Sequence, residues 1–199
     1  MRAAAERLVA EGGADALSVR TAATEAGTTT RAVYSLFGSK EGLVAAVAQT
    51  AFEYLYDEID RLPVTEDPAD DLIAIGTNVV RRLALDHPGL FRIAFQRVAG
   101  LHADPGLAAA RQRAWVQLQA AVQRLGDAGL LGTKPVPDAA REINAMWEGL
   151  ANAELRGEVL RIMPKGQEEQ AWRDALTTVV RGFATSQSRS RRRNSRSRS

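Results

Sequence analysis

The chain has 199 residues, 45% of them hydrophobic and 25% charged, a length that suits one large domain or two small ones with a core that needs no covalent staples. The absence of cysteine excludes disulfides and thiolate metal sites, and it suits a reducing cytoplasm. The formal net charge of +2 misleads, because six arginines lie in the last fourteen residues; without them, 20 basic residues face 24 acidic ones, a net charge of −4.

The N-terminal part begins with two helical patterns. Residues 2–11 place apolar side chains on one side, and the pair Gly12–Gly13 is expected to end this helix. A second helix is expected from Val19 to Ala26, with small apolar residues along one stripe. Gly27 follows as a left-handed stop, which predicts a tight turn into the next helix.

A third, short helix follows this turn, with Thr29 as its predicted N-cap. At about 100° per residue, one arc of the helix is polar and consists of Thr30, Arg31, Tyr34 and Ser35. The opposite arc is apolar and consists of Ala32, Val33, Leu36 and Phe37. Because so short a helix is unstable alone in water, the apolar arc is expected to dock on neighbouring helices. The polar arc left outside predicts a helix-turn-helix that enters a DNA groove.

The rest of the chain predicts further helices, bounded by caps and helix breakers. They are expected at residues 40–62, 67–86, 88–99, 104–128, 138–162 and 167–186. About nine helices and no convincing strand predict an all-α fold, in which a long helix joins a three-helix head to a C-terminal bundle. Residues 1–45 form the predicted DNA-binding domain, residues 46–186 the helical domain, and residues 187–199 an arginine- and serine-rich tail that is expected to be disordered.

The N-terminal part resembles the tetracycline-repressor (TetR) family of bacterial transcription regulators. The matching residues are Leu17-Ser18-Val19-Arg20, Ala26-Gly27, Tyr34, Phe37 and Ser39-Lys40-Glu41-Gly42-Leu43. The C-terminal part is similar to one subtype of the family, the WHG-type ligand-binding domain. That similarity is carried by His87–Phe95 and by Trp147, Gly149, Leu150 and Leu155.

The resemblance implies a homodimeric repressor that leaves an inverted-repeat operator when a small apolar ligand enters residues 46–186, the ligand-binding and dimerisation domain. Carried over by position, the recognition helix would present Thr29, Thr30, Arg31, Tyr34 and Ser35 to double-stranded DNA. Arg20 and Thr21 would touch the DNA backbone from the preceding helix, and Lys40 would meet a phosphate at the start of the next one.

Three of these DNA contacts have an alternative. Arg31 can donate two hydrogen bonds to guanine O6 and N7, or it can pair with a local glutamate. Tyr34 can bond a phosphate or stack on a sugar, or it can be a half-buried core residue. Lys40 at a helix N-terminus favours a phosphate site, and its alternative is a solvated lysine.

The C-terminal part contains candidates for a ligand cavity and for a subunit interface. Ligand sites are mostly apolar, and the candidate lining residues are Phe91, Phe95, Trp115, Met146 and Trp147. The alternative is that these side chains belong to the ordinary core. An interface built from four helices of two chains would use Leu150, Leu155, Trp172, Leu176, Val179, Val180 and Phe183. Here the alternative is packing within one chain.

Two other classes of function compete with the repressor. A helical-bundle enzyme needs a nucleophile with its base, a carboxylate pair or a metal set; the sequence shows none, and His87 and His102 are isolated, so we predict no catalytic residue, metal or cofactor. An RNA-associated protein would act through the tail and leave the polar arc unexplained. The tail itself either adds affinity for phosphate or only solubility. Since no apolar run spans a membrane and no signal peptide is recognisable, a cytoplasmic protein is expected.

Overall fold

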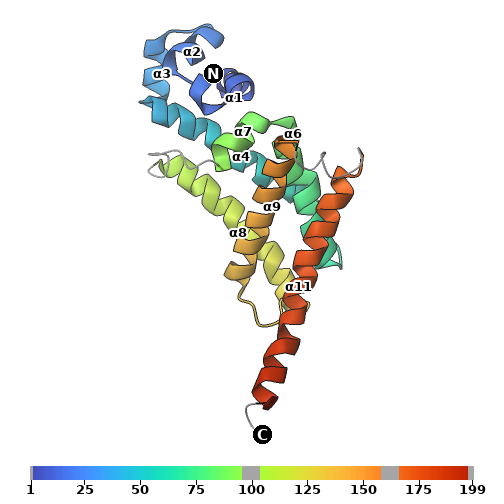
Figure 1. Ribbon diagram of the computed structural model, residues 1–199. Coiled ribbons are helices and arrows are strands. Elements are labelled where there is room, and N and C mark those ends of the chain that lie inside the picture. Colours follow the sequence, from blue (N-terminus) through green and yellow to red (C-terminus); the bar gives the residue numbers. More distant parts are fainter. Residues whose placement is uncertain (1, 96–103, 158–165, 197–199) are drawn as a thin grey trace. The chain divides into compact units, whose positions relative to one another are not determined.

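The computed structural model describes residues 2–95, 104–157 and 166–196 (Figure 1). The regular elements of these residues are α1 (Arg2–Ala16), α2 (Val19–Glu25), α3 (Thr30–Phe37), α4 (Lys40–Arg61), α5 (Pro68–Ala74), η1 (Ile75–Val80), α6 (Arg81–Asp86), α7 (Pro88–Phe95), α8 (Pro105–Asp127), α9 (Val136–Leu155) and α11 (Glu168–Arg196). Since α5, η1 and α6 are continuous, the described residues form nine helices, and no strand occurs among them. The predicted all-α fold is confirmed.

The helices belong to two compact units, which do not coincide with the predicted functional domains. Unit 1 comprises Met1–Arg61 and Arg82–Trp115, and unit 2 comprises Leu62–Arg81 and Val116–Ser199. Helix α7 therefore packs with the N-terminal helices, although the sequence analysis assigned it to the C-terminal domain. The boundaries predicted from function remain a prediction.

Three predicted helix ends differ from the structure. Helix α1 continues through Gly12 and Gly13 to Ala16, because packing of its buried face outweighs the cost of about 1 kcal/mol for each helical glycine. Helix α9 ends at Leu155, where Gly157 takes a positive φ of 70°. Helix α11 continues to Arg196, into the predicted disordered tail, since arginine favours helix and elongation costs less than nucleation. The predicted end of the helix at residues 88–99 lies outside the described residues.

The core of unit 1 forms where α1, α4 and α7 meet. At Gly89 the backbones of α7 and α1 approach closely: a Cβ there would lie 2.6 Å from the Val9 carbonyl carbon and the Ala10 nitrogen. Phe91 is fully buried next to this crossing, and its ring stacks on Phe95 with 4.7 Å between centroids. The absence of a side chain at Gly89 therefore allows α1 and α7 to pack closely.

The core of unit 2 forms between η1, α9 and α11, and the last two lie side by side (Figure 1). η1 is a π-helical turn, a wide form of helix that is rare and often found at functional sites. Gly76 lies in this turn, and a Cβ there would approach Trp147 Nε1 to 2.5 Å and Leu176 Cδ1 to 2.6 Å. The missing side chain therefore makes room for the indole of α9 and the leucine of α11.

A buried ion pair ties the same three elements together. Arg81, directly after η1, donates from Nη2 to Glu154 Oε1 of α9 over 2.7 Å, and Trp172 Nε1 of α11 donates to Glu154 Oε2 over 2.8 Å. The two charged side chains are only 12% and 7% exposed. The hydrogen bond to Glu154 raises the pKa of Arg81 above its ordinary value. We call this cluster of three residues the Glu154 junction.

Among the described residues, no helix combines the length and the apolar character that a membrane span requires.

Candidate nucleic-acid interface

Helices α2 and α3 form the predicted helix-turn-helix. Gly27 takes a positive φ of 62°, and the Thr28 N–H donates to the Ala23 carbonyl over 2.9 Å, which closes the turn. Thr29 is the N-cap of α3, and its hydroxyl oxygen accepts from the Ala32 N–H over 3.2 Å. The predicted turn and cap are both confirmed.

Helix α3 packs on α2 and α4 and leaves most of its surface outside. Val33 is fully buried, while Ala32 and Phe37 are half-buried. The predicted polar arc is exposed at each of its positions, which are Thr30, Arg31, Tyr34 and Ser35. Tyr34 is 54% exposed, which excludes the alternative of a half-buried core residue within the chain.

The prediction for Leu36 was wrong. This residue was expected on the buried arc, but its side chain is 65% exposed. A helical wheel gives the direction of each side chain, but it does not show which side chains the neighbouring helices cover. Here α2 and α4 cover the side of Val33 and stop short of Leu36.

Thr21 has a role in α2 that the sequence analysis missed. The Thr21 N–H donates to the Ser18 hydroxyl over 3.0 Å, and the Ser18 N–H donates to Thr21 Oγ1 over 2.9 Å, which forms a capping box. Thr21 Oγ1 in turn donates to the Ala16 carbonyl over 2.9 Å. A hydroxyl has one hydrogen to donate, so a bond to a phosphate would replace the bond to the Ala16 carbonyl, while the oxygen could still accept from the Ser18 N–H. The Ser-x-x-Thr spacing was the available signal.

The junction of α3 and α4 depends on two glycines. Gly38 ends α3 with a φ of 71°, and the Gly42 N–H donates to the Ser39 hydroxyl over 3.0 Å. A Cβ at Gly42 would clash with the Phe37 carbonyl oxygen. The glycine at the third position of α4 is therefore required by the close approach of α3. For the same reason, the glutamate or glutamine that would complete a capping box with Ser39 has no room at this position.

Lys40 is exposed at the start of α4, next to a carboxylate. The Glu41 carboxylate accepts hydrogen bonds from the Glu41 backbone N–H and from the Ser39 hydroxyl. These bonds hold the pKa of Glu41 below its ordinary value. An anion thus already occupies the α4 N-terminus, so a DNA phosphate here would depend on the Lys40 ammonium more than on free amides.

Three cations surround the helix-turn-helix, and they are Arg20, Arg31 and Lys40. All three are exposed, and none of them forms an ion pair within the described residues. The alternative for Arg31, an ion pair with a local glutamate, therefore finds no support here. Glu25, at the end of α2, is bound by Arg7 over 2.8 Å, which reduces its repulsion of a polyanion.

The predicted ligand-lining residues fall into both compact units. Phe91, Phe95 and Trp115 belong to unit 1, whereas Met146 and Trp147 belong to unit 2. Trp147 is 4% exposed, and Nε1 of its indole has no hydrogen-bond acceptor among the described residues.

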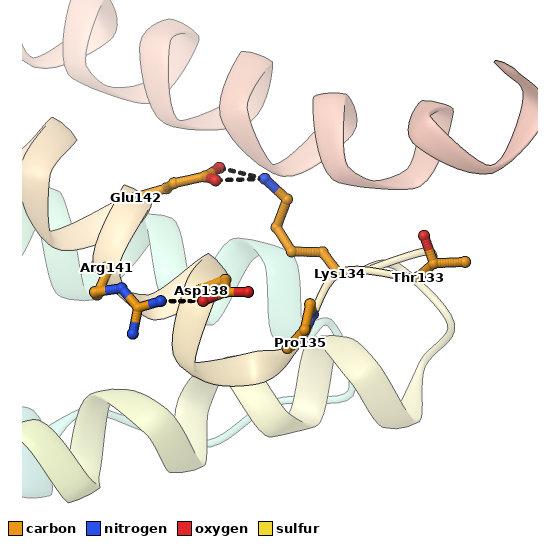
Figure 2. Close-up of a pocket in the computed structure, with 6 residues that line it drawn as sticks. All are labelled: Thr133, Lys134, Pro135, Asp138, Arg141 and Glu142. Atoms are coloured by element: carbon orange, nitrogen blue, oxygen red, sulfur yellow. Dashed lines mark hydrogen bonds and ion pairs between the residues drawn. The ribbon is translucent and has the colours of Figure 1, made fainter. Parts of the chain in front are cut away.

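Neither of two pockets in the described residues includes these side chains. The larger, about 400 Å³ in volume, lies at the start of α9 (Figure 2) and is lined by Thr133, Lys134, Pro135, Asp138, Arg141 and Glu142. Lys134 pairs with Glu142, and Arg141 with Asp138. The smaller, about 300 Å³, is lined by Glu6, Arg7, Ala10, Asp86, His87, Gly89 and Leu90. Such polar linings do not suit an apolar ligand.

Most of the predicted interface residues of α11 are buried within unit 2. Trp172, Leu176, Val180 and Phe183 are at most 6% exposed. They pack inside their own chain, with Leu176 against Gly76 and the Lys134 ammonium 4.8 Å from the Phe183 ring centroid. Their side chains are therefore not available to a second subunit. The remaining candidates, Leu150, Leu155 and Val179, are half-buried.

The described residues also contain no group of three or more histidine, cysteine, aspartate or glutamate side chains that could hold a metal ion.

Two short helices joined by a glycine turn, with a polar face exposed on the second, define a helix-turn-helix DNA-binding protein. Comparison with protein families agrees with this class. The model of "Bacterial regulatory proteins, tetR family" matches residues 2–47, and that of "Tetracyclin repressor-like, C-terminal domain" matches residues 72–179. The chain therefore belongs to the TetR family, and it is a DNA-binding transcriptional regulator. A search of curated proteins found no match.

Several solved structures have the same fold. A protein of unknown function from Rhodococcus sp. RHA1 has a TM-score of 0.76 at 24% identity, over 92% of this chain and 93% of that one. The TetR-family regulator PfmR from Thermus thermophilus has a TM-score of 0.65 at 24% identity, over 90% and 96%. FadR from Bacillus subtilis, solved in complex with stearoyl-CoA, has a TM-score of 0.69 at 15% identity, over 91% and 96%.

Proposed function

We propose that the chain is a homodimeric repressor that binds an inverted-repeat operator and leaves it when a small apolar ligand binds its C-terminal part. The observation that carries the proposal is the polar arc of α3, which is exposed and includes Arg31 without an ion-pair partner in the described structure. A recognition helix in the major groove needs a free side chain of this kind, because guanine is recognised by two donors held in one plane.

The DNA contacts divide into base contacts and backbone contacts. Arg31, with the hydroxyls of Thr30 and Ser35 beside it, faces the base edges. Tyr34 donates to a phosphate, and Arg20 and Lys40 supply the charges that release counterions. Thr29 can also donate to a phosphate, since its oxygen only accepts in the N-cap. Thr21 is assigned to the cap of α2 instead.

Dimerisation follows from the scarcity of positive charge. Three cations per subunit give little affinity for a polyanion, and two subunits double that number. In unit 2 one surface open to a partner is the outer side of α9, where Ala145 and Gly149 are exposed and nothing lies within 4 Å of a Cβ at Gly149. Small residues there permit close approach of a helix from a second copy, and Leu150 and Leu155 border them. The interface thus shifts from the buried stripe of α11 to this side of α9.

The effector is inferred to be apolar because the candidate residues of each unit have mainly apolar side chains: Phe91, Phe95 and Trp115 in unit 1, and Met146 and Trp147 in unit 2. The stearoyl-CoA bound to the similar FadR is one such molecule with a long apolar part. Trp147 Nε1 is a buried donor without an acceptor in the described structure, and it suits one polar atom of the effector. Helix α7 belongs to the C-terminal family match but packs on α1, so displacement of α7 would move the head. A ligand acts in this way only if it binds the two arrangements with different affinity.

Selection of bound duplexes from a random DNA pool tests the proposal. A symmetric dimer should enrich an inverted repeat whose half-sites lie one or more helical turns apart, about 10 base pairs each. A variant that ends at residue 186 should enrich the same repeat with modestly lower affinity, which separates a repressor from an RNA-binding tail. Enrichment of no defined sequence would contradict DNA recognition by α3, and a single asymmetric site would contradict the dimer.

A further inference from the structure

The last turns of α11 carry a regular pattern of arginines that the proposed contacts with the operator do not use. The helix continues to Arg196. Four positions in its final turns are spaced by three, four and seven residues from the first of them, and they are Arg189, Arg192, Arg193 and Arg196. At 3.6 residues per turn, these positions fall within about 100° of the helix circumference. We call them the arginine arc.

The arginine arc continues the exposed side of α11. Thr178 and Gly182 are exposed in unit 2, and the helical repeat places both within about 20° of Arg189. The buried Leu176 and Val180 lie about 140° and 180° away from Arg189 in the same repeat. The backbone of the helix therefore carries the arc on the side opposite to the one that packs in unit 2.

The end of α11 has no apolar stripe. Residues 186–196 contain only serine, glutamine, asparagine and arginine. A helix of this composition has nothing to bury in a protein core, and it lacks the apolar face that holds an amphipathic helix in a lipid surface. The partner that fits it is recognised by charge.

The spacing of the arginines matches the charge of a nucleic-acid strand. Like charges three and four residues apart destabilise a helix, so the arc has an unfavourable energy that an anionic partner removes. Its four charges extend over about 10 Å, or one charge per about 3.5 Å, at a rise of 1.5 Å per residue. Each strand of duplex DNA carries one phosphate per about 3.4 Å of helix axis.

We propose that the arginine arc is a second DNA-binding site, which binds the phosphates of duplex DNA independently of sequence. The chain is a DNA-binding regulator, so duplex DNA is the polyanion that it meets in its function. The helix-turn-helix supplies three cations, and the arc adds four to them. This inference goes beyond the proposed function, because it requires neither repression nor an inverted repeat.

The salt dependence of binding to a duplex of arbitrary sequence tests the inference with the full chain. Each neutralised phosphate contributes about −0.9 to the slope of log K against log salt concentration. A variant in which glutamine replaces all four arginines of the arc should reduce the size of this slope by about 3.6 for each bound α11. Over a fourfold rise in salt, the wild type should lose about 150-fold more affinity than this variant. An unchanged slope would overturn the inference.

A charge-matched variant is the control for this measurement. It replaces with glutamine four exposed arginines that lie outside the arc and the helix-turn-helix, which are Arg61, Arg82, Arg113 and Arg141. Its net charge equals that of the arc variant, and its slope should equal that of the wild type. Circular dichroism should show that both variants keep the wild-type fold. Equal slopes of the two variants would mean that only net charge matters, which contradicts a site on α11.

Two neighbouring arginines test the helical arrangement. Arg192 belongs to the arc, whereas Arg191 lies about 160° from Arg189 on the other side of the helix. Arg192→Gln should reduce the size of the slope by about 0.9, and Arg191→Gln should change it much less. Equal effects of the two substitutions would mean that the arginines act as a chain without helical order, and the arc would be rejected.

The DNA on which the arc acts can be the operator duplex or a separate segment. If it is the operator duplex, extending the selected duplex by about 20 base pairs on each side, two helical turns, should strengthen binding of the wild type but not of the arc variant. If it is a separate segment, the operator-bound wild type should capture a second labelled duplex and the arc variant should not. Either result supports the inference, and the absence of both contradicts it.

RNA of the same length provides the remaining comparison. Stronger arc-dependent binding to RNA than to duplex DNA would overturn the assignment to DNA. Failure to enrich an operator from a random pool would count against the proposed function, and it would leave the measurement on the arbitrary duplex unaffected.

Discussion

Helix α3 leaves most of its side chains outside, whereas the Glu154 junction encloses even its charged ones. In α3 only Val33 is fully buried, and Leu36 is 65% exposed. In the junction, Arg81 and Glu154 are 12% and 7% exposed and form an ion pair, and Trp172 donates a hydrogen bond to Glu154. The contrast separates two kinds of residue. Those of α3 serve binding and contribute little to folding, while those of the junction hold three elements together and lie in the other compact unit.

The largest effect is expected for Glu154→Gln, which removes the buried negative charge of the Glu154 junction. The amide can replace the carboxylate in shape but not in charge, and it leaves the Arg81 guanidinium buried without its counterion. The free energy of unfolding should fall by about 3–5 kcal/mol, as it does when one partner of a buried ion pair is removed. The midpoint of urea unfolding, at unchanged slope, measures this loss.

Glu142→Gln is the control for this substitution. Glu142 pairs with Lys134, but its side chain is 52% exposed, so the loss should stay below about 1 kcal/mol. Equal effects of the two substitutions would mean that the Glu154 junction is as well solvated as the surface.

The next largest effect is expected for Arg31→Ala. Loss of a two-donor contact to guanine should cost about 1–3 kcal/mol of binding free energy in each half-site, which abolishes specific binding at ordinary protein concentrations. Because Arg31 is exposed and unpaired in the described structure, the free energy of unfolding should change by no more than about 0.5 kcal/mol. A gel-shift titration with the selected duplex, beside urea unfolding, measures both quantities.

Arg61→Ala provides the control, since Arg61 is an exposed arginine at the end of α4, away from the helix-turn-helix. It should retain the operator affinity. Unchanged affinity of Arg31→Ala would remove Arg31 from the interface and with it the main support for the proposed function.

The sequence predicted α3 well because the signals are local. A glycine turn and a threonine N-cap lie next to the helix, and they correspond to an observed dihedral angle and an observed hydrogen bond. Leu36 was missed because the width of the buried arc depends on the neighbouring helices, which the wheel does not include. The capping role of Thr21 was missed because the same hydroxyl fits two roles.

The junction could not be predicted in the same way. Arg81 and Glu154 are 73 residues apart, and in sequence each looks like a charged residue on a helix surface. The π-helical turn η1 depends on Trp147 and Leu176, which lie on helices much later in the chain than Gly76. No local pattern specifies such contacts, because tertiary packing selects them. The buried stripe of α11 illustrates the same limit, since its pattern alone does not show whether its partner is this chain or a second copy.

A pH-dependent effect of intermediate size is expected at Asp71, which lies in unit 2. Burial opposes ionisation of this carboxyl, but hydrogen bonds from Thr65 and Arg124 outweigh it, and its pKa lies below the ordinary value. A carboxyl with a lowered pKa contributes stability above its unfolded pKa of about 3.9, and the contribution is lost as the pH falls through the folded pKa. Asp71→Asn should therefore lower the free energy of unfolding by about 1–2 kcal/mol at pH 7.

The measurement is the difference in unfolding free energy between wild type and Asp71→Asn from pH 7 to pH 3. The difference should be constant down to about pH 5 and should shrink below pH 4. Asp127→Asn is a control on the same unit, because Asp127 is exposed and accepts one hydrogen bond from Gln123. A difference that grows on acidification would reverse the sign and contradict the assigned contacts.

The smallest expected effect divides the helix-turn-helix itself into folding and binding residues. Thr21→Val keeps the shape of the side chain but removes the hydroxyl of the capping box, so the free energy of unfolding should fall by about 1 kcal/mol. The affinity of the folded protein for the operator should stay the same. Thr30→Val should weaken operator binding and leave the free energy of unfolding unchanged. The reason is that the Thr30 hydroxyl is exposed and has no hydrogen-bond partner within the described residues.

Thr21→Ser and Thr30→Ser restore each hydroxyl and should restore the corresponding property, which excludes a nonspecific effect of valine. If Thr21→Val weakened operator binding more than Thr30→Val did, the hydroxyl of Thr21 would bond the DNA as well as the cap of α2. One side chain would then serve both folding and DNA binding, so the two groups of residues would not be separate. If the two valine variants separate as expected, the boundary between folding and binding runs between α2 and α3, within the motif.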